Sequence, residues 1–173
     1  MATQQQIDEL IEKMSAERAK LLAALESMSE EELERSPDDG EWNSKQQMSH
    51  LCEMESAYRA WVEKALEEDG ASVDGIYGEP PAIRLEEANQ YSGTQHIAEM
   101  RRQRAQTLRL IESLSLDDYE RTATNKLFGR LTVMQWLRSY YRHDRMHVDQ
   151  LSGRDPEYRP KFQSGREPDQ RRG

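Results

Sequence analysis

The sequence predicts an all-α protein, an up-down-type four-helix bundle with a long connection between its second and third helices. Apolar residues recur at helical spacing in four segments, at residues 4–28, 44–68, 94–114 and 133–152. A capping box, in which Ser or Thr is followed three residues later by Glu or Gln, stands near the start of each segment. No segment shows a convincing strand pattern, so four amphipathic helices are expected to pack against one another.

Five capping boxes mark the expected helix starts in chain order. The two side chains of such a box satisfy backbone N–H groups that the first helical turn leaves unpaired. The boxes are Thr3–Gln6, Ser29–Glu32, Ser44–Gln47, Ser92–Gln95 and Thr132–Gln135. The second box predicts one extra turn at residues 29–33, and residues 115–119 form another candidate turn. Gly153 follows the last apolar-periodic residue and predicts the end of the fourth helix.

The connection between the second and third helices is rich in glycine and proline. Residues 70–91 contain three glycines and two prolines, which oppose a continuous helix. Connections of this length are often functional, and one interpretation is a lid. A plain crossover between two helices is the more common alternative, and the sequence leaves both open.

Composition and charge exclude several classes of protein. Hydrophobic residues make up 35% of the chain and charged residues 33%, which suits amphipathic helices better than a buried parallel sheet. The formal net charge of -9 repels nucleic-acid phosphates. No apolar run reaches membrane-spanning length, the first six residues are polar, and a single cysteine excludes an internal disulfide. We therefore expect a cytoplasmic protein without nucleic-acid or membrane partners.

The last twenty residues differ from the rest. Residues 1–153 are expected to form the bundle, and residues 154–173 a polar, weakly basic C-terminal tail with six basic and four acidic residues. A solvated tail is a more common meaning of this composition than a tethering segment.

Two histidines four residues apart are the strongest chemical signal. His143 and His147 project from one face of the fourth helix, on its apolar stripe. Such a pair alone is more often a hydrogen-bonded pair than a metal site, because a metal site needs a third ligand from elsewhere. His50, near the apolar stripe of the second helix, supplies that third imidazole. His96 is interpreted as a surface histidine.

Three neutral imidazoles leave coordination positions open, as in catalytic rather than structural metal sites. Imidazole suits zinc, nickel, iron and copper, so the ligands do not select the ion. Carboxylates could orient the rings, and the sequence neighbours are Asp144, Asp149 and Glu53, each more often a solvated helix charge. Cys52 is interpreted as a buried structural thiol. Four side chains could line a pocket: Trp61, Tyr140, Tyr141 and Arg142. Aromatic residues at helical spacing more often belong to the hydrophobic core.

Two stretches resemble the DinB-like superfamily of metal-binding four-helix bundles. DDGEWNSKQQMSHLCEME, at residues 38–55, resembles the family's Trp-Ser opening of the second helix, followed by a His-Leu pair and a glutamate. GRLTVMQWLRSYYRHDRMHVDQL, at residues 129–151, resembles its Gly-x-x-Thr start and its closing His-Asp-x-x-His-x-x-Gln-Leu pattern. Asn43 stands where the family usually has serine, and asparagine caps helices equally well. The likeness extends over most of residues 7–151, without the 70–91 connection.

The resemblance implies a metal site and leaves several activities open. The family's histidines map onto His50, His143 and His147, which implies one divalent ion, expected to be zinc, nickel or iron. The leading expectation is a metal-dependent enzyme with a small-molecule substrate, such as a transferase that uses a low-molecular-weight thiol. A metal-dependent hydrolase and a non-enzymatic metal-binding, ligand-binding or stress-response bundle are the alternatives. Dimeric relatives, and exposed aromatics such as Trp61 whose surface a symmetric dimer would cover, favour a homodimer.

Overall fold

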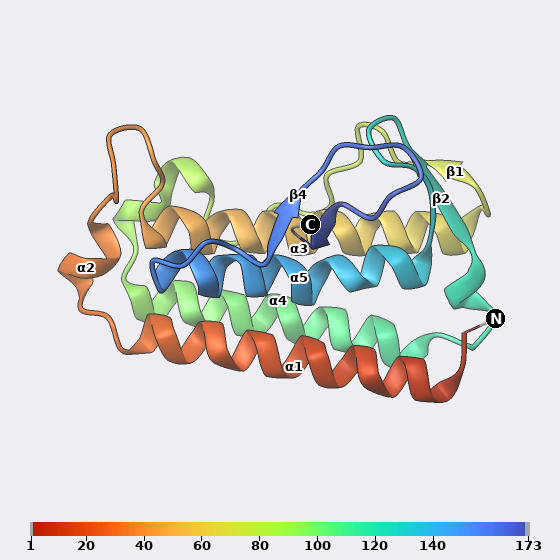
Figure 1. The fold of residues 1–173 in the computed structure, drawn as a ribbon, viewed down its shortest axis with the longest axis horizontal. Helices are drawn as coiled ribbons and strands as arrows, with labels where there is room; N and C mark the ends of the chain where they lie inside the picture. Colours follow the sequence, from red (N-terminus) through yellow and green to blue (C-terminus); the bar gives the residue numbers. More distant parts are fainter. Residues whose placement is uncertain (1, 172–173) are drawn as a thin grey trace.

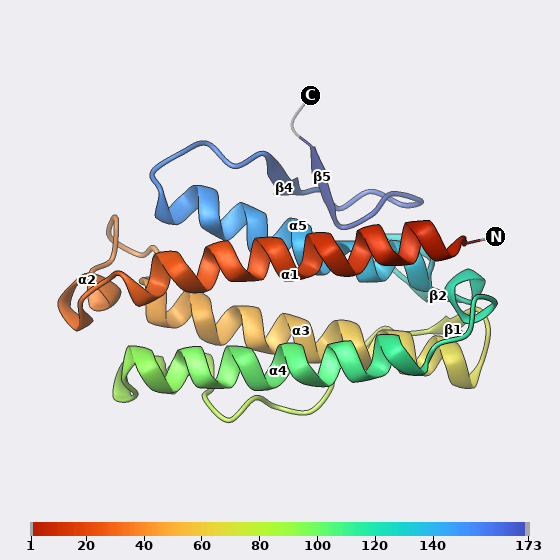
Figure 2. The same cartoon turned by 90° about the horizontal axis from the view of Figure 1, so that it is seen from below.

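The computed structural model describes residues 2–171, which form a bundle of four long helices (Figure 1). The helices are α1 (Gln4–Glu26), α3 (Ser44–Glu67), α4 (Gly93–Ser113) and α5 (Val133–Leu151). Each packs against two neighbours, in the order α1, α5, α3, α4 around the bundle (Figure 2). The predicted four-helix bundle is therefore confirmed. None of the helices described is long and apolar enough to cross a membrane.

The directions of the helices explain the long connection. Figure 1 shows α3 and α4 running the same way along the bundle, while α1 and α5 run the opposite way. Because α3 and α4 are parallel neighbours, the chain between them must return along the bundle before α4 begins. It does so through the short strand β1 (Ala71–Ser72) and the 3₁₀ helix η1 (Leu85–Gln90).

The structure adds short strands that the sequence pattern did not predict. β1 pairs in parallel with β2 (Thr122–Asn125), which pairs antiparallel with β3 (Gly129–Thr132) just before α5. A second pair, β4 (Tyr158–Pro160) and β5 (Asp169–Arg171), lies against α5. Strands of two to four residues are too short for alternation of apolar and polar residues to be recognised.

Four of the five predicted capping boxes begin helices in the structure, and the remaining box, at the start of α3, lies one residue earlier than expected. α1, α5, α4 and the short α2 (Glu30–Glu34) start at their predicted boxes. The cap of α3 is Asn43, whose side chain accepts from the Gln46 N–H, so the expected Ser44–Gln47 box is wrong. Asn43 also donates to Asn89 of η1, at 2.8 Å. The side chain of Gln47 is consequently available for another role.

A buried ion-pair network crosses the middle of the bundle and takes one residue from each long helix. Arg18 of α1 and Arg104 of α4 both bind Glu55 of α3 and Asp144 of α5, with distances of 2.7–3.0 Å. Asp144 is 1% exposed, so the expectation of a solvated charge there is wrong. Two cations balance two anions, which offsets the desolvation of each charge.

The network divides the core into two apolar clusters. Along α1, Arg18 separates Met14 of the first cluster from Leu21 of the second. Along α5, Asp144 likewise separates Tyr140 of the first cluster from Val148 of the second. The bundle is thus held by two apolar layers with a charged layer between them, and this arrangement fixes how α5 faces α3.

Two aromatic rings expected at the surface are buried. His96 is 1% exposed, and its Nε2 donates to the carbonyl of Ala88 at 2.8 Å, which ties η1 to α4. Trp61 packs edge-on against Trp136, and its Nε1 donates to the carbonyl of Ile76 at 2.7 Å. Trp61 therefore gives no support to a dimer, and the homodimer stays a prediction.

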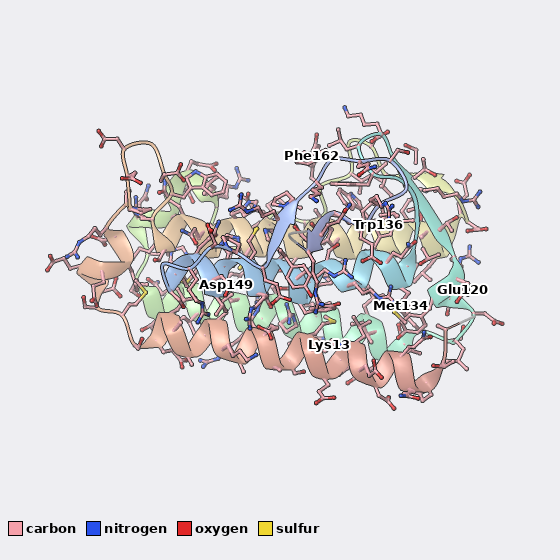
Figure 3. All side chains as sticks on the ribbon, viewed as in Figure 1. Lys13, Glu120, Met134, Trp136, Asp149 and Phe162 are labelled. Atoms are coloured by element: carbon pink, nitrogen blue, oxygen red, sulfur yellow. The ribbon has the colours of Figure 1, made fainter. Side chains whose placement is uncertain are left out.

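The residues after α5 fold back onto the bundle. Tyr158 of β4 is buried, and Arg142 of α5 donates to the carbonyl of Asp169 in β5 at 3.0 Å. Asp149, expected to be solvated, is buried near the end of α5 (Figure 3) and accepts from Arg154 and from the backbone N–H of Glu157. Most of residues 154–171 are exposed, as expected for a solvated segment, but Tyr158, Pro168 and Asp169 are buried, so the segment also packs against the bundle.

Candidate metal centre

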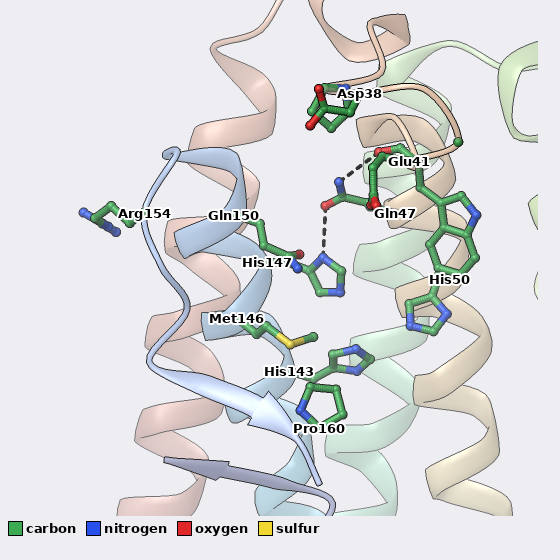
Figure 4. A pocket seen from close by; sticks show the side chains of 13 residues that line it. Asp38, Glu41, Gln47, His50, His143, Met146, His147, Gln150, Arg154 and Pro160 are labelled. Carbon is green, nitrogen blue, oxygen red and sulfur yellow. Dashed lines mark hydrogen bonds between the residues drawn. The ribbon is translucent and has the colours of Figure 1, made fainter. Parts of the chain in front are cut away.

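The three histidines meet between α3 and α5. One ring nitrogen each of His50, His143 and His147 lies within 4.8 Å of the others (Figure 4). The two rings on α5 have centroids 5.0 Å apart, as expected for residues separated by one helical turn. The His50 ring from α3 lies 5.2 Å from that of His143 and 6.1 Å from that of His147. The structure thus brings together the three side chains singled out in the sequence.

The hydrogen bonds of His147 fix which nitrogen is free. Its Nδ1 lies 3.0 Å from Oε1 of Gln47, and an amide oxygen only accepts, so Nδ1 carries the proton. The amide of Gln47 is held in turn, because its Nε2 donates to the carbonyl of Trp42 at 3.2 Å. Nε2 of His147 is buried and has no hydrogen-bond partner among the described residues. An unpaired buried acceptor is unfavourable, and a bound cation would satisfy it.

All three imidazoles are held in the neutral form that binds metals. Burial lowers the pKa of His50, and burial together with the two neighbouring rings lowers the pKa of His143 well below its ordinary value. Burial, the His50 ring and Arg18 lower the pKa of His147 to about 3. Two nitrogens on one tetrahedral zinc ion are about 3.4 Å apart. The ring nitrogens lie within 4.8 Å of one another, so side-chain rotation toward a common point would bring all three onto one ion.

No fourth side chain closes the centre. Within residues 2–171, the ligand cluster contains only the three histidines, which leaves coordination positions for other molecules. The carboxylates considered from the sequence do not orient the rings, because Asp144 and Asp149 are engaged elsewhere and Glu53 accepts from the backbone N–H of Leu85. Gln47 takes that role instead. Gln47 lies three residues before His50, one turn away on the same helix face, and this spacing was the sequence signal that could have identified it.

Two cavities of different character meet at the histidines. One, of about 570 Å³, is the more polar of the two and is lined by all three histidines together with Asp38, Glu41, Gln150 and Arg154 (Figure 4). The other, of about 390 Å³, shares His50 and His143 and is largely apolar. Its apolar lining includes Met54, Tyr58, Trp61, Ile76, Phe128 and Phe162. Of the aromatics considered from the sequence, Trp61 lines this cavity, while Tyr140 is buried in the core.

The single cysteine lies outside both cavities. Cys52 is buried in the second apolar cluster with Leu21 and Leu25. Burial raises the pKa of its thiol above the ordinary value, so the reactive thiolate is disfavoured. The interpretation of Cys52 as a buried structural thiol is confirmed.

Comparison with known proteins gives a family match and several structural likenesses. Residues 13–151 match the sequence profile of the DinB superfamily. Uncharacterized protein YuaE of Bacillus subtilis (strain 168) is 24% identical over 140 residues, which cover 73% of this chain and 85% of that protein. YfiT from Bacillus subtilis, reported as "a probable metal-dependent hydrolase with an unusual four-helix bundle topology", superposes with a TM-score of 0.71 at 18% identity, over 88% of this chain and 87% of YfiT.

A second solved structure is that of a mycothiol-dependent maleylpyruvate isomerase. It superposes with a TM-score of 0.67 at 11% sequence identity, and the match covers 84% of this chain and 60% of the isomerase chain. At these identities the structural likenesses establish the fold.

Proposed function

The chain belongs to the DinB superfamily, and we propose that it is a metal-dependent enzyme whose ion activates a low-molecular-weight thiol for transfer to a small molecule. The observation that carries the proposal is the buried, unpaired Nε2 of His147 beside two further neutral imidazoles. The open side of the centre leads into cavities large enough for small molecules, as in an enzyme rather than a closed structural site.

Each residue of the centre has a definite part in this proposal. His50, His143 and His147 would hold the ion, and Gln47 would keep His147 in the tautomer that offers Nε2. The ion would supply Lewis acidity, which lowers the pKa of a bound thiol or water and makes it a nucleophile near neutral pH.

The two cavities suit two different reactants. The polar cavity offers Asp38, Glu41 and Arg154 to the charged and hydroxyl groups that low-molecular-weight thiols carry. The apolar cavity suits a less polar acceptor molecule, which would meet the thiol beside His50 and His143. The likeness to a mycothiol-dependent isomerase supports a thiol as the first reactant.

A metal-dependent hydrolase is the second candidate. The likeness to YfiT favours it, and the same centre could activate water in place of a thiol. The two candidates differ in whether the reaction depends on added thiol. A closed, non-enzymatic metal site is less well supported, because no fourth ligand joins the three histidines in the described residues.

Elemental analysis of protein without a histidine tag tests the metal site and identifies the ion. We expect close to one divalent ion, zinc, nickel or iron, per chain. His143→Ala and His147→Ala should each remove most of it while helical circular dichroism stays near native. His96→Asn is the matched control, since His96 is buried but lies outside the cluster, and it should keep the ion. Full occupancy in the double variant His143→Ala/His147→Ala would contradict the proposal.

Cobalt-substituted protein tests the thiol. Sulfur bound to cobalt gives a charge-transfer band that nitrogen and oxygen ligands do not give. Adding bacillithiol, mycothiol or glutathione should produce that band, and His50→Ala should abolish it. The responding thiol should then accelerate conjugation of an electrophile. Absence of the band with all three thiols would favour the hydrolase.

A further inference from the structure

Asp169 is a buried carboxyl group that the metal centre does not use. It begins β5, is 3% exposed, and lines the apolar cavity that His50 and His143 also line. Its Oδ2 is buried and has no hydrogen-bond partner among the described residues. By contrast, the buried carboxylates Glu55 and Asp144 are paired with arginines. A lone carboxyl oxygen at an apolar cavity is the arrangement expected for a group that binds a ligand.

The C-terminal segment builds one wall of this cavity. Pro160, Phe162, Pro168 and Asp169 line it. The segment is anchored opposite β3, because the N–H of Gly165 donates to the carbonyl of Phe128 at 2.7 Å. The match to the DinB superfamily ends at residue 151, so this wall lies outside the matched part of the chain.

The charged and titratable groups around Asp169 leave its carboxyl without a strong cationic partner. Arg142 of α5 is bound to the Asp169 carbonyl, and its guanidinium forms an ion pair with Glu167. The other ionisable side chains that line the cavity are Tyr58 and His50 of α3, His143 of α5, and Asp74, Tyr77 and Lys126 of the loops. Burial raises the pKa of Asp169 to about 7, and Arg142 opposes this only in part. A protonated carboxyl can donate a hydrogen bond.

We propose that Asp169 is the specificity-determining residue of the apolar cavity, which binds an aryl or alkyl molecule through a hydrogen bond from this carboxyl to an acceptor oxygen of the ligand. The hydrocarbon part fills the space between Trp61, Phe128 and Phe162. The substrate class is thus an apolar carbonyl or related compound. The reaction of the bound molecule rests on the proposed function. Binding of the molecule to the apolar cavity requires no ion.

Two ligands of nearly equal shape test the hydrogen bond in metal-free protein. Acetophenone has an acceptor oxygen, and α-methylstyrene replaces that oxygen with a methylene group. At pH 6, titrations followed by NMR of the methionine methyl groups, including that of Met54, should give acetophenone about tenfold tighter binding, as expected for one buried hydrogen bond. Asp169→Ala should bring the two affinities within twofold of each other. Asp169→Asn retains an N–H donor and should keep the preference.

The pH dependence separates recognition from a merely structural role. In the wild type the preference for acetophenone should disappear by pH 8.5, because a carboxylate cannot donate, while in Asp169→Asn it should persist. Gln170→Ala is the matched control, since Gln170 neighbours Asp169 on β5 without lining the cavity, and it should behave as the wild type. The inference is overturned by equal affinities in the wild type, by failure of both ligands to bind, or by a preference that survives Asp169→Ala. Failure of the proposed function would instead appear as missing metal or a missing thiol band.

Discussion

Arg18 and Asp144 form a bidentate ion pair in the centre of the bundle although 126 residues separate them in the chain. Nε and Nη2 of Arg18 lie 3.0 and 2.9 Å from the two carboxylate oxygens. Asp144 directly follows His143, so the pair positions the start of the α5 turn that carries His143 and His147 against α1. The stability of the bundle and the geometry of the centre are therefore linked through two adjacent residues.

Removing one partner of this network should destabilise the protein strongly. Asp144→Ala leaves two buried arginines with only one of their two shared anions, and we expect a loss of about 3–5 kcal/mol in the free energy of unfolding. Urea denaturation at pH 7 measures it. Asp8→Ala, at an exposed position of α1, is the control and should change stability by less than about 0.5 kcal/mol. A loss below 1 kcal/mol in Asp144→Ala would show that the network contributes little.

Glu55 should make the protein sensitive to acid. Burial alone would raise the pKa of Glu55, but the guanidiniums of Arg104 and Arg18 outweigh it and lower the pKa to about 2. Because the folded pKa lies below the ordinary value of 4.5, the stabilisation is complete above pH 4.5 and is lost as the pH falls toward 2. The shift corresponds to roughly 3 kcal/mol. At pH 7 the midpoint temperature of thermal unfolding should be lower for Glu55→Gln than for the wild type. On acidification this temperature should fall less in the variant than in the wild type.

Gln47 should control metal affinity without being a ligand. Gln47→Ala removes the acceptor that holds the Nδ1 proton of His147, and we expect a 10–100-fold loss of zinc affinity. Gln47→Glu retains an acceptor oxygen and should bind zinc at least as tightly as the wild type. Competition with a chromophoric chelator measures both. Gln150→Ala, in the same cavity, is the control. Equal zinc affinity in Gln47→Ala and the wild type would show that Gln47 does not contribute to metal binding.

The features that the sequence predicted lie mostly within single helices, and those it missed depend on partners in other segments. Capping boxes and the spacing of His143 and His147 lie within one or two helical turns, so they could be recognised without a structure. His96 was misjudged because its partner is the carbonyl of Ala88, which the crossover connection brings to it. The strands were missed because they are short and pair across loops.

The charged layer did have a signal in the sequence. Arg18 lies on the apolar stripe of α1, four residues after Met14 and three before Leu21. A charge on a buried face needs a partner, so its position predicts an ion pair. Which residue supplies the opposite charge could not be deduced, because many acidic residues occupy comparable positions on the other helices. Only the packing order of the helices selects Glu55 and Asp144.

Asp169 should lower the stability of the protein as the pH rises from about 4 to about 7. Burial raises its pKa from 3.8 to about 7, so the folded protein holds a proton between these values that the unfolded chain releases. A folded pKa above the unfolded one gives a stability contribution that is lost as the pH rises. The shift sets an upper limit of about 4 kcal/mol, and local opening of the β4–β5 segment reduces it. Asp169→Asn cannot ionise and should therefore lack this decline.

Urea denaturation of the wild type and Asp169→Asn at pH 5 and pH 8 isolates this effect, because all other titrating groups are shared. We expect the variant to gain stability relative to the wild type by about 1–3 kcal/mol between the two pH values. Carbon-13 NMR of labelled aspartate carboxyls should locate the titration of Asp169 near pH 7 in the folded protein. Parallel stability profiles, together with a carboxyl that titrates near pH 4, would mean that solvent reaches Asp169. The apolar cavity would then carry a permanent negative charge at neutral pH, which would favour ligands with a hydrogen-bond donor over the carbonyl compounds proposed above.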